Sequence, residues 1–227
     1  MFDAHSHIQY KIFDADREAV IERAREENIK MIVVGTDYEM SISAIELAQK
    51  YPQDLWATVG LHPNDAAGGF DPVRSKSPQA TAGRFARASN GVDKKKFLEL
   101  AQNSKVVAIG ECGLDYYRKQ GDQKLNSKNQ KEVFKQQIEI SQELNKPLMI
   151  HARASRGTDD AYEDVFAEIS NFKLLIPKVM HFYAGSLVVT KKLVAAGYYF
   201  TFGGVITFTH DYDEQIKYIP MDRIMLE

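Results

Sequence analysis

Short apolar runs along the chain alternate with longer segments in which apolar residues recur every three or four positions. The short runs have the length and composition of buried β-strands, whereas the longer segments have the spacing of amphipathic helices. The strands are expected at about 2–8, 31–35, 55–60, 106–111, 147–151, 178–181, 198–202 and 223–227. The helices are expected at about 14–28, 39–50, 97–103, 127–144, 158–169, 186–196 and 213–218.

Regular alternation of strands and helices predicts parallel βα units in an α/β fold. Such units form either an open doubly wound sheet or a closed barrel. Eight units favour the (β/α)8 TIM barrel, and no glycine-rich phosphate loop follows the first run, as a nucleotide-binding sheet would require. The eighth run, 223–227, stands at the end of the sequence, so the expected barrel is truncated at strand eight.

The alternation breaks between residues 64 and 92, where glycine, alanine, serine and proline dominate. Structureless loops of this length are uncommon inside a compact domain and are usually lids or disordered segments. We therefore expect a single barrel domain over 1–227, with a flexible insertion at 64–92 after strand three. The insertion is either a mobile spacer or a basic flap over a polyanionic substrate; its basic residues, with those that follow, are Arg74, Lys76, Arg84, Arg87 and Lys94–Lys96.

Composition limits the class of protein. Hydrophobic residues make up 44% of the 227 residues, enough for a sizeable core. The net charge of −2 provides no general basic field, so nucleic acid would have to be held by a local patch or by metal. The single cysteine, Cys112, excludes an internal disulfide, and no apolar run approaches the ~20 residues of a membrane span. With no signal-peptide pattern at the start, we expect a cytoplasmic protein.

Candidate metal ligands fall at the ends of the predicted strands. His5 and His7 lie two residues apart in the first run, so their side chains share one face. Glu111, His151 and His181 end three further runs. Barrel enzymes carry their chemistry at the carboxyl ends of the strands, and a carboxylate between two groups of histidines suits two bridged divalent ions.

Several motifs in one order resemble the TatD-related metal-dependent deoxyribonucleases, which belong to the amidohydrolase-type barrel enzymes. They cover nearly the whole chain outside 64–92. The matching segments are Asp3-Ala4-His5-Ser6-His7, Val59-Gly60-Leu61-His62-Pro63, Ala108-Ile109-Gly110-Glu111-Cys112-Gly113-Leu114-Asp115-Tyr116, Pro147-Leu148-Met149-Ile150-His151-Ala152-Arg153, His181-Phe182-Tyr183-Ala184-Gly185-Ser186 and Ile219-Pro220-Met221-Asp222-Arg223-Ile224-Met225-Leu226-Glu227.

The resemblance implies two divalent metal ions and a DNA substrate, with no membrane association and no obligate protein partner. His5, His7 and Glu111 would bind one ion, and Glu111, His151 and His181 the other; Zn²⁺, Mn²⁺ and Mg²⁺ remain open. The residues implied near the substrate phosphate are His62, Asp115 and Arg153. Glu111 and His62 are the candidate catalytic residues. Hydrolysis of phosphodiester bonds in DNA by a two-metal, water-activating mechanism is the leading hypothesis.

Two alternatives stay open at the level of the sequence. Related two-metal barrels hydrolyse esters or amides, including D-aminoacyl-tRNA, although Glu111 at the bridging position favours the nuclease branch. The family pattern also continues past Leu-Glu to Thr-Asp, where the Asp is implied as a metal ligand and general base. The sequence ends at Glu227, which is not expected to replace it. An inactive metal-binding barrel or fragment is therefore the second alternative.

Overall fold

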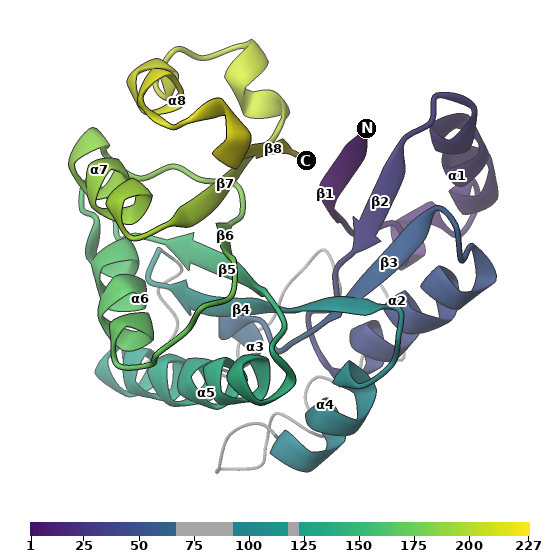
Figure 1. Cartoon of the computed structure of the whole chain (residues 1–227), viewed down its shortest axis with the longest axis horizontal. Helices are drawn as coiled ribbons and strands as arrows, with labels where there is room; N and C mark the ends of the chain where they lie inside the picture. Colours follow the sequence, from purple (N-terminus) through teal and green to yellow (C-terminus); the bar gives the residue numbers. More distant parts are fainter. Residues whose placement is uncertain (67–92, 118–122) are drawn as a thin grey trace.

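Eight parallel strands close into a barrel in sequence order, with helices on its outside (Figure 1). The computed structural model describes residues 1–66, 93–117 and 123–227. The prediction of a (β/α)8 barrel is therefore confirmed. The strands are β1 (Phe2–Ser6), β2 (Lys30–Val33), β3 (Leu55–Val59), β4 (Val106–Asp115), β5 (Leu148–Arg153), β6 (Lys178–Met180), β7 (Tyr198–Phe202) and β8 (Ile224–Leu226).

Helices connect consecutive strands and cover the outer face of the barrel. The α-helices are α1 (Arg17–Glu26), α2 (Tyr38–Lys50), α3 (Pro63–Ala66), α4 (Lys94–Ala101), α5 (Gln123–Leu144), α6 (Asp160–Ser170), α7 (Leu187–Ala195) and α8 (Asp213–Tyr218). Short 3-10 turns are η1 (Lys11–Phe13), η2 (Gly204–Thr207) and η3 (Met221–Arg223). The predicted helices match seven of these elements, and α3 is the α-helix that the sequence pattern did not separate from the loop.

The core lies between the strands and the surrounding helices. Phe134 and Ile138 of α5 are fully buried, as are Leu148 and Ile150 of β5 and Val165 of α6. Burial of each large apolar side chain contributes about 1.5–3 kcal/mol. This packing fixes the strands to which the site residues belong.

Strand β8 completes the barrel by pairing on both sides. Phe202 of β7 is in register with Leu226, and Leu226 in turn is in register with Asp3 of β1. The eighth run expected from the sequence is thus a short strand that closes the sheet. Its last residue is followed directly by Glu227, at the same end of the barrel as the ends of β6 and β7.

Strand β4 is longer than the sequence predicted. The apolar run predicts an end at Glu111, but the strand continues to Asp115, and its pairing with β5 extends to Asp115 opposite Arg153. The buried Cys112 and Leu114 carry the strand beyond the charged residue. A charge normally ends an apolar run, but the carboxylate of Glu111 is buried here because histidines surround it.

The predicted insertion is described only at its edges. Residues 64–66 belong to α3, and Lys94–Lys96 open α4 after Asp93, whose side chain accepts a hydrogen bond from the backbone N–H of Lys96 at 3.3 Å. Residues 67–92, with Arg74, Lys76, Arg84 and Arg87, lie outside the described residues. The flap hypothesis stays a prediction. Among the described helices, none is both long and apolar enough to cross a membrane.

Candidate metal centre

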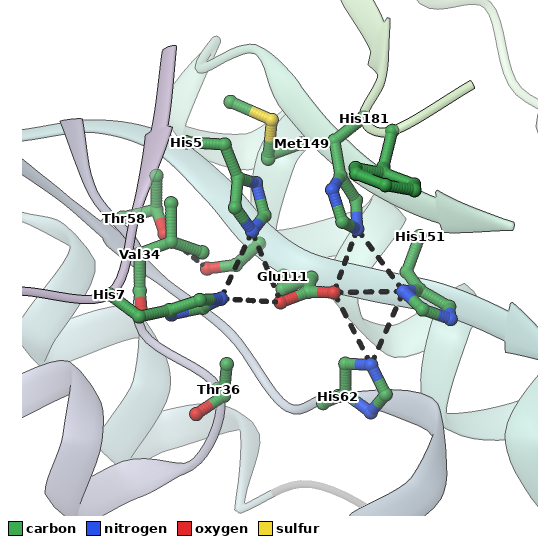
Figure 2. Close-up of polar contacts among 12 residues, drawn as sticks. His5, His7, Val34, Thr36, Thr58, His62, Glu111, Met149, His151 and His181 are labelled. Carbon is green, nitrogen blue, oxygen red and sulfur yellow. Dashed lines mark hydrogen bonds and ion pairs between the residues drawn. The ribbon is translucent and has the colours of Figure 1, made fainter. Parts of the chain in front are cut away.

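Five histidines surround the carboxylate of Glu111: His5, His7, His62, His151 and His181 (Figure 2). His5 Nε2 and His7 Nε2 lie 3.5 and 3.6 Å from Glu111 Oε2. His151 Nδ1 and His181 Nε2 each lie 2.8 Å from Glu111 Oε1. The structure therefore brings together the five residues that the strand-end pattern placed at one mouth of the barrel.

The backbone around Glu111 is held by neighbouring strands. The Glu111 N–H donates to the carbonyl oxygen of Gly35 at 2.7 Å, and the hydroxyl of Thr58 donates to the carbonyl of Gly110 at 2.6 Å. Glu111 is 3% exposed and Thr58 is fully buried. The position of the carboxylate is thus set by contacts from β3, from β4 and from the loop after β2.

The two oxygens of Glu111 divide the cluster into two groups. Oε2 faces His5 and His7, whose Nε2 atoms are 3.2 Å apart. Oε1 faces His151 and His181, whose Nδ1 and Nε2 atoms are 3.1 Å apart. Imidazole nitrogens and carboxylate oxygens are ligands of divalent metal ions. Two sets of three around Glu111 have potential ligand atoms within 4.8 Å of one another, namely His5, His7 and Glu111, and His62, Glu111 and His151.

His62, which follows β3, contacts the second group directly. Its Nε2 atom lies 3.3 Å from Glu111 Oε1 and 3.3 Å from His151 Nδ1. Its Nδ1 atom accepts the backbone N–H of Asn64 at 3.1 Å, in the first turn of α3. The resemblance implied a place for His62 near the substrate; the structure puts it against Glu111 itself.

Asp115 and Arg153 occupy very different environments at the ends of paired strands. Asp115 is 2% exposed, and its Oδ2 atom lies 3.2 Å from His151 Nε2. Its carboxylate thus holds the ring edge of His151 that faces away from Glu111. Arg153 is exposed, with its guanidinium 4.0 Å from the ring centre of Tyr117. A role of either residue at a substrate phosphate stays a prediction.

The charges of the cluster depend on one another. Burial would raise the pKa of Glu111, but the charges of His181 and His62 and the hydrogen bonds of His151 and His181 lower it well below its usual value. Burial would lower the pKa of His181, but the Glu111 carboxylate, together with Glu227, raises it to about 10. His5 differs: burial and the nearby His181 charge lower its pKa.

Glu227 is the member of the cluster that sequence reasoning missed. Its Oε2 atom lies 3.7 Å from His181 Nδ1 and accepts the Thr201 hydroxyl at 2.6 Å. His5, His181 and Glu227 form a further group whose potential ligand atoms lie within 4.8 Å of one another. The available signal was the same as for His181, namely an ionisable residue directly after a strand-like run.

Comparisons with known proteins agree with this geometry. A family model described as "TatD related DNase" matches residues 2–227. An uncharacterised metal-dependent hydrolase of Bacillus subtilis, YabD, is 33% identical over all of this chain and 78% of its own length. The 3'-5' ssDNA/RNA exonuclease TatD of Erwinia tasmaniensis is 31% identical with the same coverage. The crystal structure of YJJV, a TatD homologue from Escherichia coli, superposes with a TM-score of 0.78 at 25% identity, covering all of this chain and 78% of that one.

Proposed function

Because the chain belongs to the TatD-related DNase family, we propose that it is a metal-dependent hydrolase that cleaves phosphodiester bonds in DNA. The observation that carries this proposal is the convergence of His5, His7, His151 and His181 on the two oxygens of Glu111. A relative named as an exonuclease acting on single-stranded DNA and RNA supports the nucleic-acid substrate.

The types of donor atom in both groups fit divalent metal ions, and in the first group the spacing of the atoms fits as well. Two ligands bound at 2.0–2.2 Å to a tetrahedral ion lie roughly 3.3–3.6 Å apart. The three separations among His5 Nε2, His7 Nε2 and Glu111 Oε2 are 3.2, 3.5 and 3.6 Å. In the second group, Glu111 Oε1 lies 2.8 Å from both His151 and His181, the distance of hydrogen bonds from protonated imidazoles.

We infer two ions, one held by His5, His7 and Glu111 and the other by Glu111, His151 and His181. His62 Nε2, at 3.3 Å from Glu111 Oε1, borders the second group. Mixed imidazole and carboxylate ligation is compatible with Zn²⁺, Mn²⁺ and Mg²⁺, and the number of histidines favours Zn²⁺ or Mn²⁺. Such ions, when bound, act as Lewis acids towards the phosphoryl oxygens and lower the pKa of water.

The protein's own residues orient this centre and bind the substrate. Asp115 holds His151 through its Nε2 atom, so that Nδ1 is turned towards Glu111. Arg153, exposed at the end of β5, is the cation placed to bind a backbone phosphate, with the ring of Tyr117 beside its guanidinium. His62 and Glu111 remain the candidate catalytic residues among those described.

The single-barrel organisation and the location remain proposals. Pairing of β8 with both β7 and β1 supports one barrel domain over 1–227. The single cysteine, buried Cys112, supports a reducing compartment such as the cytoplasm. Hydrolysis of another ester or an amide, and a metal-binding barrel without activity, are not favoured, since the relatives are named as metal-dependent hydrolases and DNA or RNA exonucleases.

The test is cleavage of an end-labelled single-stranded oligonucleotide in the presence of Mn²⁺, Zn²⁺ or Mg²⁺. Glu111→Gln removes the carboxylate shared by both groups. The variant should lose several kcal/mol of transition-state stabilisation, so its cleavage rate should fall by at least about 100-fold. Glu139→Gln, at an exposed glutamate that pairs with Lys94 on the outside of the barrel, is the control and should cleave normally. Cleavage that survives EDTA, or equal rates in the two variants, would contradict the proposal.

A further inference from the structure

Three buried polar atoms without a hydrogen-bond partner gather on the side of the cluster away from Glu111. They are His5 Nδ1, His181 Nδ1 and Glu227 Oε1, half of the buried side-chain atoms without a partner among the described residues. The rings of His5 and His181 stack with their centres 3.9 Å apart and 9° between their planes. A buried polar atom without a partner is costly, so three in one place call for a common explanation.

The orientation of the two imidazoles explains which atoms are left over. Both rings turn Nε2 towards Glu111, so Nδ1 lies on the opposite edge of each ring (Figure 2). A neutral imidazole that binds a metal ion through Nε2 carries its proton on Nδ1. Metal-binding histidines almost always donate that second N–H to a carboxylate, a carbonyl or water. His5 and His181 therefore each need an acceptor behind the centre.

Glu227 is the carboxylate placed to be that acceptor. Its Oε2 atom lies 3.7 Å from His181 Nδ1, about half an ångström beyond a direct hydrogen bond. The Thr201 hydroxyl, which donates to Oε2 at 2.6 Å, fixes the side chain and leaves Oε1 free. Asp3 also lies near His5, but its carboxylate accepts the backbone N–H of His5 at 3.0 Å instead of the ring proton.

We propose that Glu227 is a positioning residue that accepts the Nδ1 protons of His5 and His181, directly or through one water. Glu111 links the two metal groups on the side of the Nε2 atoms. On the side of the Nδ1 atoms, Glu227 would orient one histidine of each group, His5 and His181. The inference rests on the proposed metal centre but not on the nature of the substrate. It also accounts for a glutamate after β8 whose side chain is only 5% exposed, where strand pairing alone requires none.

A further metal ion bound by His5, His181 and Glu227 is the competing explanation. The three groups lie close enough together. However, each imidazole would then have to give up both of its ring protons and bridge two ions. Neutral imidazole with one proton is the ordinary metal ligand, so the role of proton acceptor is favoured, and the count of bound ions separates the two explanations.

The experiment measures Zn²⁺ binding to the metal-free protein by competition with a chromophoric chelator, without nucleic acid. Glu227→Ala should weaken Zn²⁺ affinity by 10- to 100-fold, the usual cost of losing such an outer partner. Glu227→Gln keeps an uncharged acceptor and should lose less. Thr201→Val should have a Zn²⁺ affinity close to that of Glu227→Gln. Glu139→Ala makes the same truncation at an exposed site and should bind Zn²⁺ as tightly as the unaltered chain does. In ¹⁵N spectra of the zinc-loaded protein, the Nδ1–H signals of His5 and His181 should broaden in Glu227→Ala.

Each result decides between the alternatives. Unchanged Zn²⁺ affinity and unchanged Nδ1–H signals in a folded Glu227→Ala protein would overturn the inference; if that variant does not fold, unchanged values in Glu227→Gln would do so. If Glu227→Ala binds one ion fewer per chain and holds the others at full affinity, Glu227 is a metal ligand, and the inference that it is a positioning residue is likewise overturned. An unaltered chain that binds no Zn²⁺, Mn²⁺ or Mg²⁺ would instead refute the proposed metal centre, and this inference with it.

Discussion

Gly60 and Gly110 approach so closely that a β-carbon on Gly60 would lie 2.4 Å from the carbonyl carbon of Gly110. Real β-carbons do not come this near to backbone atoms, so the residue after β3 and the middle of β4 can meet only without a side chain at Gly60. Gly110 immediately precedes Glu111, whose N–H is held by Gly35. The place of the central carboxylate therefore depends on a contact between two glycines.

Substitution of Gly60 should both destabilise the barrel and displace Glu111. Gly60→Ala forces backbone apart in a packed interior, which typically costs 1–3 kcal/mol, and we expect a matching fall in the midpoint of urea unfolding together with weaker metal binding. Gly204→Ala is the control, because nothing lies within 4 Å of the β-carbon it would add. Equal midpoints for the two variants would show that the contact between Gly60 and Gly110 is not restrictive.

Removal of the Arg153 guanidinium should affect nucleic-acid binding more than chemistry. Arg153 is exposed and stacks with Tyr117 but pairs with none of the residues around Glu111. We expect Arg153→Ala to raise KM for an oligonucleotide, to reduce the salt dependence of its binding by about one phosphate contact, and to leave Zn²⁺ affinity as it was. Arg23→Ala, on α1, serves as the control. An unchanged KM and salt slope would remove Arg153 from the substrate path.

The metal-free protein should lose stability as the pH rises above neutrality. Glu111 and Glu227 raise the pKa of His181 from 6.5 to about 10 in the folded state, against the effect of burial. A raised folded-state pKa contributes stability that is complete below about pH 6.5 and disappears as the pH rises through about 10. The free energy of unfolding in EDTA should therefore fall between pH 7 and pH 10.

A variant without the ionisable ring isolates this effect. His181→Gln should show a flatter profile than the unaltered chain over the same pH range, in urea unfolding with EDTA. Zn²⁺ competes with the His181 proton, so its apparent affinity should rise with pH as protons are released. A stability that rises from pH 7 to pH 10 in the unaltered chain relative to His181→Gln would have the wrong sign for the raised pKa.

The sequence predicted most of the fold because each βα unit carries its own local pattern. Apolar runs located all eight strands, and the position of His5, His7 and His181 at strand ends followed from that pattern. Glu111 was placed correctly against the histidines although the end of β4 was not, since the strand continues through the buried Cys112 and Leu114 to Asp115. The pattern of apolar residues along one strand cannot predict that a charged residue within it is buried, because that burial depends on partners from other strands.

The contacts behind the centre could not be predicted from the sequence for the same reason. Asp115 against His151 joins neighbouring strands 36 positions apart in the sequence, and Glu227 against His181 joins the ends of β8 and β6, 46 positions apart. His62 also lies nearer to Glu111 than the motif alone implied. Motifs specify which residues meet at the mouth, whereas the closure of the sheet decides which edge of each imidazole faces which carboxylate.

The central claim, a two-metal centre built around Glu111, is tested most directly by anomalous diffraction from crystals soaked in Zn²⁺ or Mn²⁺. We predict two peaks about 3.5–4 Å apart, one between His5, His7 and Glu111 Oε2 and the other between Glu111 Oε1, His151 and His181. Crystals of Glu111→Gln should lose at least one of them. The absence of any peak within bonding distance of Glu111 in the unaltered protein would contradict the account.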